Sequence, residues 1–184
     1  MVDLILVIGG LVALAVILFI VLYNGLVSLR VKVENAFAQV DVQLKQRSDL
    51  VPNLVEAVKG YAKHEKSVFE DVTKARAAMM NAGSIAGKAQ ASDMLTGALK
   101  SLFAVAENYP QLRASENFKE LQVELTDLES KIAYARQFYN DAVQDYNTQI
   151  AVLPNSLLAG GLGFQKKEFF QAAEEERKSV RVKF

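Results

Sequence analysis

The sequence predicts an all-α protein, in which an N-terminal transmembrane helix continues into an antiparallel four-helix bundle with two long and two short helices. Three observations support this fold class. The chain opens with an unbroken apolar run, the remainder repeats apolar residues at alternating steps of three and four, and only three of the 184 residues are proline. Apolar residues with a period near 3.5 are typical of helices packed at about 20°.

A transmembrane anchor is predicted at residues 1–23. Leu4–Leu22 contains no polar side chain, and 19 residues of helix span about 28 Å, close to the hydrocarbon thickness of a bilayer. A cleavable signal peptide is the alternative, but residues 1–3 carry no Lys or Arg and the one small-x-small site lies inside the apolar run. The residues expected to anchor the chain are Leu4, Val7, Leu11, Leu14, Leu18, Leu22 and Tyr23.

The bundle is predicted at residues 24–153, with helices at about 24–62, 65–82, 89–109 and 116–152. The last helix has the most regular heptads, at Phe118, Leu121, Leu125, Leu128, Ile132, Ala135, Tyr139, Ala142 and Tyr146.

Glycine and proline mark the helix boundaries. Asn81-Ala82-Gly83 ends the second helix, and Pro110 follows the end of the third. Pro52 lacks a backbone donor, so it should kink the first helix beside Ser48.

The boundary between the first two helices has two interpretations. Gly60 and the sequence Ser67-x-x-Glu70, which fits a capping box, indicate a break near residues 60–66. The heptad phase continues from Tyr61 to Val68, however, so one long helix through this region stays open.

The composition argues against catalysis and nucleic-acid binding. The 21 Lys and Arg are balanced by 21 Asp and Glu, so no net basic field attracts nucleic acid. With no Cys and only His64, the sequence lacks thiolate zinc sites, Cys nucleophiles and the Glu-x-x-His pairs of di-metal bundles. The glycines at 160–163 lack the spacing of a nucleotide-binding loop. We therefore expect no enzyme activity, catalytic residue, cofactor or metal.

Charged residues beside the span predict its orientation. Asp3 precedes it, whereas Arg30, Lys32, Lys45 and Arg47 follow it. The positive-inside rule then places the N-terminus outside and the bundle in the cytoplasm.

Long strings of the chain resemble the LemA family of bacteria. They are YNGLVSLR at 23–30, VENAFAQVDVQL at 33–44, RSDLVPNLV at 47–55, ENF at 116–118, AYARQFYN at 133–140, and the stretch 154–170. The resemblance implies a single-pass protein of the bacterial inner membrane with an antiparallel four-helix bundle, and it implies no reaction. Through gene neighbours it also implies a membrane metalloprotease as partner and a role in envelope stress.

An apolar seam is expected to stay open on the two long helices, because the short helices cannot cover their full length; such a seam usually marks an interface. The C-terminal segment 154–184 should lie near the membrane, with residues 157–170 against lipid headgroups or neighbouring subunits. Alternatively, this segment covers the seam. The candidate interface residues are Val33, Phe37, Tyr139, Tyr146, Leu157, Leu158, Phe164, Lys166, Lys167, Phe169 and Phe170.

These observations favour a membrane-anchored scaffold or adaptor that self-associates and acts in envelope organisation or stress. The alternative is a membrane-remodelling or pore-like assembly in which many anchors pack together. The expected partners are the lipid bilayer, further copies of the chain and a membrane metalloprotease. Residues 116–153 hold seven acidic and three basic side chains, a balance that favours packing against the mildly basic first helices.

Overall fold

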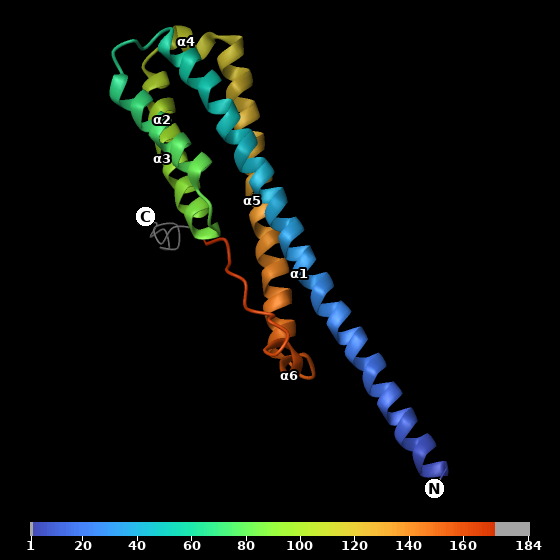
Figure 1. Ribbon diagram of the computed structural model, residues 1–184. Coiled ribbons are helices and arrows are strands. Elements are labelled where there is room, and N and C mark those ends of the chain that lie inside the picture. Colours follow the sequence, from blue (N-terminus) through green and yellow to red (C-terminus); the bar gives the residue numbers. More distant parts are fainter. Residues whose placement is uncertain (1, 172–184) are drawn as a thin grey trace, which may run out of the picture.

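The structure is a computed structural model and describes residues 2–171, a range that contains helices and no strands. The helices are α1 (Val2–Lys59), α2 (Lys66–Asn81), α3 (Ile85–Glu107), α4 (Pro110–Ala114), α5 (Glu116–Ala151) and α6 (Asn155–Ala159). Figure 1 shows that α1 extends far beyond the other helices at its N-terminal end. The all-α class is therefore confirmed; the part of the predicted C-terminal segment beyond residue 171 lies outside the described residues.

The apolar run and the first helix of the body form one uninterrupted helix, α1. The large apolar side chains of its residues 2–21 are exposed, and within residues 2–171 it is the one helix long and apolar enough to cross a membrane. Gly25 lies inside α1 without breaking it, because one glycine costs only about 1 kcal/mol in a helix. The predicted continuity of the apolar run with the first helix of the body, without a loop, is confirmed.

α1 and α2 are separate helices. α1 ends at Lys59, and the carbonyl of Val58 accepts the N–H groups of both Tyr61 and Ala62, which closes the last turn. Ala62 is fully buried in the connection. The continuous helix that the heptad phase left open is therefore wrong. The capping box is also wrong, because α2 already begins at Lys66.

α3 begins four residues earlier than predicted, at Ile85. Ser84 is extended and its Oγ accepts the N–H of Gly87 at 3.0 Å, so Ser84 caps the helix. A Cβ on Gly87 would lie 2.9 Å from that oxygen, which explains the glycine at this position. The sequence also did not predict α4, a single turn with proline at its start.

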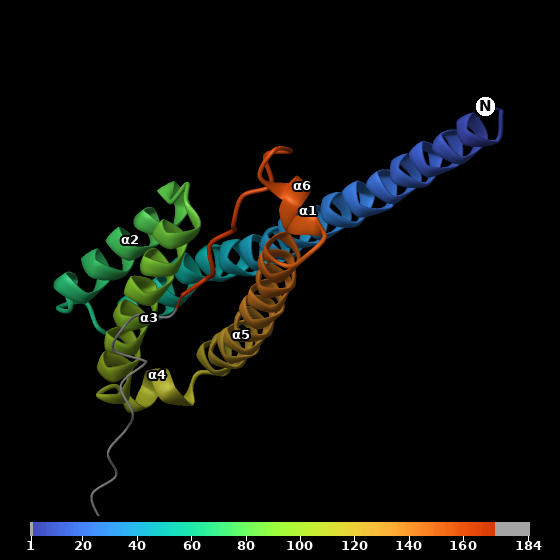
Figure 2. The same ribbon diagram turned by 90° about the horizontal axis from the view of Figure 1, so that it is seen from below.

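The two long helices, α1 and α5, lie side by side and run in opposite directions (Figure 1). The α2–α3 hairpin packs on the half of α1 away from the apolar run, as Figures 1 and 2 both show. α5 contacts α3 through side chains such as Phe118, whose ring lies 6.1 Å from that of Phe103. The helices thus form two antiparallel pairs joined through α1, and a regular four-helix bundle stays a prediction.

The core has two parts. One lies beneath the hairpin and is built on Leu54, Leu95 and Leu102, which are completely buried. The other lies along the lower α1–α5 pair, the stalk, and is built on Val40, Tyr139 and Val143. The hairpin does not reach the lower end of the stalk, so another segment must cover these side chains.

Candidate functional site

The chain after α6 covers the stalk. Residues 164–171, here called the strap, are not helical and run from α6 towards the hairpin (Figure 1). Asn140 donates to the Phe170 carbonyl at 3.1 Å and accepts the Phe170 N–H at 2.8 Å. Asn147 pairs with Lys167 in the same way, at 2.9 and 2.8 Å. Two asparagines of α5 therefore hold the strap by its backbone.

The spacing of these two pairs follows from backbone geometry. Asn140 and Asn147 are one heptad apart, which places them on the same face of α5 and about 10.5 Å apart along its axis. Lys167 and Phe170 are three residues apart, about 10 Å in an extended chain. Seven helical residues and three extended residues therefore cover nearly the same distance. The strap runs antiparallel to α5, so each asparagine amide lies opposite the backbone groups that it binds.

Side chains of the strap add an apolar anchor to this backbone recognition. Phe170 is 2 % exposed, and the guanidinium carbon of Arg136 lies 4.6 Å from its ring centroid. The hydroxyl of Tyr139 donates to the Glu168 carbonyl at 2.7 Å. Burial, with the negative charge of Glu168, raises the pKa of Tyr139 to about 12, so this hydroxyl stays a donor at physiological pH.

The strap corrects the expectation that the seam of the stalk is open. Val33, Tyr139 and Tyr146 are buried in one cluster with Phe164 and Phe170 of the strap. The remaining candidate interface residues divide into two groups. Phe37, Leu158 and Lys167 are half-buried; Leu157, Lys166 and Phe169 are exposed.

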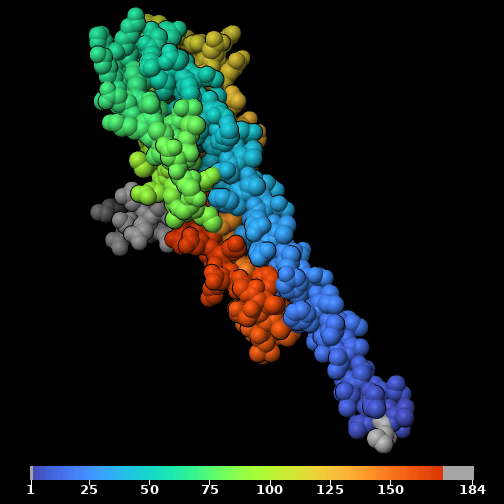
Figure 3. Space-filling view, viewed as in Figure 1, coloured from blue at the N-terminus to red at the C-terminus, as the bar shows by residue number. Residues whose placement is uncertain are grey.

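The strap begins where the apolar run ends. The ring of Phe164 packs edge-on against Tyr23 at 6.0 Å, and Arg30 lies 5.8 Å above the same ring. Phe19 stacks on Tyr23 from the side of the span, at 6.2 Å. Figure 3 shows α6 and the adjoining strap packed beside α1 below the hairpin. Aromatic rings beside an arginine are typical of the level at which a helix leaves a membrane.

A buried cation joins three helices above the stalk. Arg47 of α1 is 1 % exposed; its guanidinium lies 2.7 Å from Glu129 of α5 and donates to Thr96 of α3 at 2.8 Å and to Ser92 at 3.4 Å. Burial lowers the pKa of Arg47 and the nearby Arg136 adds to this effect, while Glu129 opposes it. The heptad pattern places Arg47 at a core position but predicted none of these partners.

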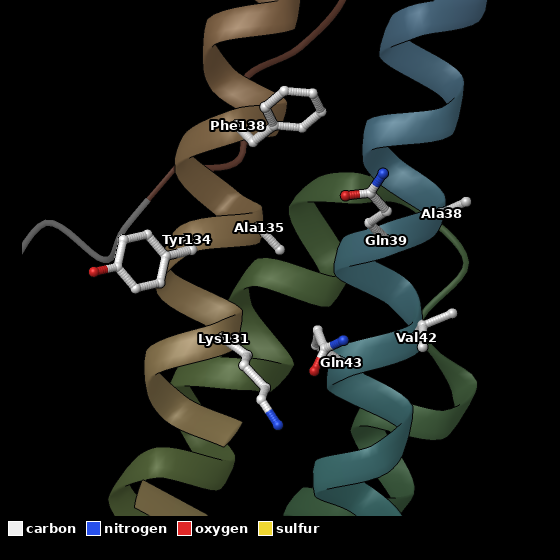
Figure 4. Close-up of a pocket in the computed structure, with 8 residues that line it drawn as sticks. All are labelled: Ala38, Gln39, Val42, Gln43, Lys131, Tyr134, Ala135 and Phe138. Carbon is white, nitrogen blue, oxygen red and sulfur yellow. The ribbon is translucent and has the colours of Figure 1, made fainter. Parts of the chain in front are cut away.

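An exposed groove runs between α1 and α5 on the face turned away from the hairpin (Figure 4). Its volume is about 530 Å³, and its lining residues are Ala38, Gln39, Val42, Gln43, Lys131, Tyr134, Ala135 and Phe138. Tyr134 is 75 % exposed and Phe138 45 %. By contrast, Tyr139 and Tyr146 belong to the core, as their heptad positions predict.

The single histidine of the sequence lies apart from these features. His64 is exposed in the connection between α1 and α2. Within residues 2–171, no three His, Cys, Asp or Glu side chains come together in a way that could hold a metal. The sites that sequence reasoning missed are Asn140 and Asn147; their heptad spacing was the available signal.

Comparisons with known proteins agree with the resemblance noted above. The chain is 27 % identical over 175 residues to the magnetosome proteins MamQ 2 and MamQ 1 of Paramagnetospirillum magneticum, an alignment that covers 81 % of this chain and 64 % of each relative. The chain therefore spans less than two-thirds of these relatives. It is 25 % identical over 154 residues to protein LemA of Metamycoplasma hominis, covering 81 % of this chain and 68 % of that one.

The family comparison covers most of the chain. The sequence profile of the LemA family matches residues 36–184, which include the groove, the buried Arg47 and the asparagines that hold the strap. On this match, the chain belongs to the LemA family.

Proposed function

We propose that this protein is a membrane-anchored helical adaptor that self-associates and presents its body to other proteins at the membrane surface. The observation that carries the proposal is the continuity of α1, in which an exposed apolar span and the core of the body belong to one helix. A continuous helix fixes the direction and height of the body relative to the bilayer, which a flexible linker would not do.

The strap supports a fixed position at the membrane. Phe164 of the strap contacts Tyr23 at the end of the span. Exposed cations follow each of these two residues closely in the sequence: Arg30 and Lys32 follow Tyr23 on α1, and Lys166 follows Phe164 on the strap. Each basic side chain near an anionic leaflet contributes about 1 kcal/mol to membrane attraction. The exposed side chain of Leu157 on α6 suits the headgroup zone, whereas Phe169 lies at the other end of the strap, beside Ala86 and Ala89 of α3.

The orientation belongs to the same proposal. The basic residues Arg30 and Lys32 follow the span directly, and Asp3 lies at its other end, so the body is placed in the cytoplasm and the N-terminus outside. The membrane is then the bacterial inner membrane, and the role is in organising the envelope through protein contacts.

The absence of cysteine from the sequence gives a direct test of the topology. Asp3→Cys places a single thiol at the exposed N-terminal end of α1, and His64→Cys places one in the exposed turn that follows α1. With a membrane-impermeant maleimide, we expect labelling of the Asp3→Cys protein in spheroplasts and of the His64→Cys protein only after lysis. The reverse pattern would overturn the orientation, and extraction of the protein by alkaline carbonate would overturn the anchor.

Self-association is tested on the full chain in lipid nanodiscs. The expected result is a mass of two or more copies by native mass spectrometry at micromolar concentration. A single chain in each disc under these conditions would contradict the self-association in this proposal.

A further inference from the structure

The connection between α5 and the strap is apolar and exposed. Residues 152–163, here called the corner, contain α6 and no charged side chain. Its exposed large apolar residues are Val152 with 42 % of its area exposed, Leu153 with 72 %, Leu157 with 77 % and Leu162 with 38 %. Connections that face water are ordinarily polar, as residues 60–65 are with Lys63 and Glu65 between α1 and α2. Contiguous exposed apolar side chains like those of the corner mark a contact surface.

The uncharged region extends beyond the corner and has a counterpart on α1. Residues 146–165 contain no Asp, Glu, Lys, Arg or His, and neither do residues 4–29. Lys32 of α1 pairs with Asp145 of α5 at 3.0 Å, so the two uncharged stretches begin at nearly the same level of this antiparallel pair. The first charged residue after the corner is Lys166. Charged residues therefore stop together on α1, α5 and the strap, at the end of the body that faces the apolar run.

Helix lengths place the corner at the surface of the membrane. Leu22, at the end of the apolar run, lies ten residues before Lys32, about 15 Å along α1. α5 continues for six residues after Asp145, which brings its end about 9 Å closer to the span. α6 is the part of the body that lies farthest towards the N-terminal end of α1 (Figure 1), and the chain leaves the corner at Phe164, which packs on Tyr23. The headgroup zone is about 6 Å thick on each side of the hydrocarbon core, so the corner reaches it.

The corner also bonds part of its own backbone, which favours contact with lipid. The N–H of Ser156 donates to the carbonyl of Val152 at 2.9 Å. Further along, the N–H of Leu162 donates to the carbonyl of Leu158 at 3.0 Å. Backbone groups without partners are costly away from water, so a compact turn with internal bonds suits the membrane surface better than an extended loop does.

We propose that the corner is a second membrane contact of this chain, in which Leu153 and Leu157 enter the boundary between lipid headgroups and acyl chains beside the span. Lipid is the partner because the corner continues the apolar surface of the span through the contact of Phe164 with Tyr23. The inference rests on the membrane anchor proposed above, and adds the residues that touch lipid. It also moves the lipid contact expected at residues 157–170 towards α5, since Phe164 is buried.

A second contact has a mechanical consequence for the body. One helix that crosses a bilayer is free to change its tilt, and neighbouring helices and interfacial anchors restrict that freedom. The corner lies beside α1 and is joined to it along the whole stalk, so its insertion holds the long axis of the stalk at one angle to the membrane.

Spin labels in the cysteine-free chain measure the depth of the corner. Leu157→Cys, Val123→Cys and Leu11→Cys each carry one nitroxide in the full chain, in nanodiscs of phosphatidylethanolamine and phosphatidylglycerol. Val123, 63 % exposed towards the opposite end of α5, is the matched control in water, and Leu11 of the span, 62 % exposed, is the reference in lipid. Power saturation compares collisions with oxygen, which concentrates in lipid, and with a water-soluble nickel chelate. We expect the label at Leu157 to lose most of the nickel collisions seen at Val123 and to keep its oxygen collisions.

The other outcomes separate this inference from the anchor. Nickel collisions at Leu157 equal to those at Val123, with Leu11 in lipid, would overturn the corner and leave the anchor standing. Few collisions with either reagent at Leu157 would mean that a neighbouring chain covers the corner, which would overturn the contact with lipid. Frequent nickel collisions at Leu11 would overturn the anchor and, with it, the corner.

Acidic substitution tests whether the two leucines hold the corner in place. In the variant Leu153→Asp with Leu157→Asp, a label at Leu162→Cys should gain nickel collisions, because a carboxylate at the acyl boundary is costly. Val123→Asp should leave that label unchanged. Thermal unfolding in detergent should change little in either protein, since the substituted side chains are exposed in the chain. A label at Leu162 that stays in lipid in the double variant would overturn the role of Leu153 and Leu157 as the lipid contacts.

Discussion

The side-chain amide of Asn140 forms two hydrogen bonds with the backbone of Phe170, one as donor at 3.1 Å and one as acceptor at 2.8 Å. An asparagine that satisfies both polar groups of one peptide residue replaces the partner that a neighbouring strand would supply. This pair, with Asn147 and Lys167 one heptad away, allows an extended segment to pack on a helix without leaving its backbone groups unpaired.

Removing both amides should release the strap. In the variant Asn140→Ala with Asn147→Ala, four hydrogen bonds are lost, and the free energy of unfolding should fall by about 2–3 kcal/mol. Hydrogen exchange at the amides of Lys167 and Phe170 is the direct measurement, and it should accelerate strongly. Asn53→Ala, at an exposed position on α1, is the control. Unchanged protection at residues 167 and 170 would contradict the role of the two asparagines.

The long helices could be predicted from the sequence because the apolar run marks the first part of α1, and heptads record burial along the rest of α1 and along α5. The strap could not, because residues 164–171 have no periodic pattern and their positions depend on side chains some 20–30 residues earlier. For Phe164 and Phe170 the sequence leaves two positions open, at lipid or subunit contacts and over the seam of the stalk, because their apolar character fits both; in the structure both are buried in the core of the stalk. The partners of Arg47 could not be predicted either. A heptad position shows that its side chain faces inward, but not that Glu129 and Thr96 bind its guanidinium.

Tyr139 should make stability depend on pH in the alkaline range. Its pKa is raised by burial to about 12 in the folded chain, against an ordinary value of 10. Between pH 10 and 12 the unfolded chain releases this proton while the folded chain retains it, so the stabilising contribution is complete below pH 10 and lost as pH rises. We expect a loss of about 2 kcal/mol across this window.

The variant Tyr139→Phe isolates that contribution. The unfolding free energy of wild type minus that of the variant, measured by urea titration at each pH, should fall by about 2 kcal/mol from pH 10 to 12 and therefore change sign. Below pH 10 the variant should be about 1 kcal/mol less stable, because the Glu168 carbonyl loses its donor. Tyr134→Phe, at a position that is 75 % exposed, is the matched control. A constant difference for Tyr139→Phe would contradict the raised pKa.

The buried charge of Arg47 predicts that two substitutions differ in how much stability they cost. Glu129→Gln leaves a fully buried guanidinium without its counter-charge and should cost about 3 kcal/mol. Arg47→Met removes the buried charge, keeps much of its volume, and leaves Glu129 with 40 % of its side chain exposed to water. Its cost should be within about 1 kcal/mol. Chemical denaturation of both proteins checks the order, with the exposed Arg113→Met as control. A larger loss for Arg47→Met would show that the cation stabilises the fold outright.

Pro52 and Arg76 should be coupled through one carbonyl. Pro52 has no N–H, so the carbonyl of Ser48, four residues earlier in α1, has no helical donor; Nε of Arg76 on α2 donates to it instead, at 2.8 Å. Arg76→Ala should therefore cost about 1–2 kcal/mol, the cost of leaving this buried acceptor unpaired. Pro52→Ala restores the helical donor at this carbonyl, so in that background the same Arg76→Ala change should cost less than about 0.5 kcal/mol. A double-mutant cycle from thermal or urea unfolding of the four proteins measures the coupling. Equal costs of Arg76→Ala in the two backgrounds would mean that Arg76 stabilises the α1–α2 contact through its charge or its packing, and not through the carbonyl that the proline frees.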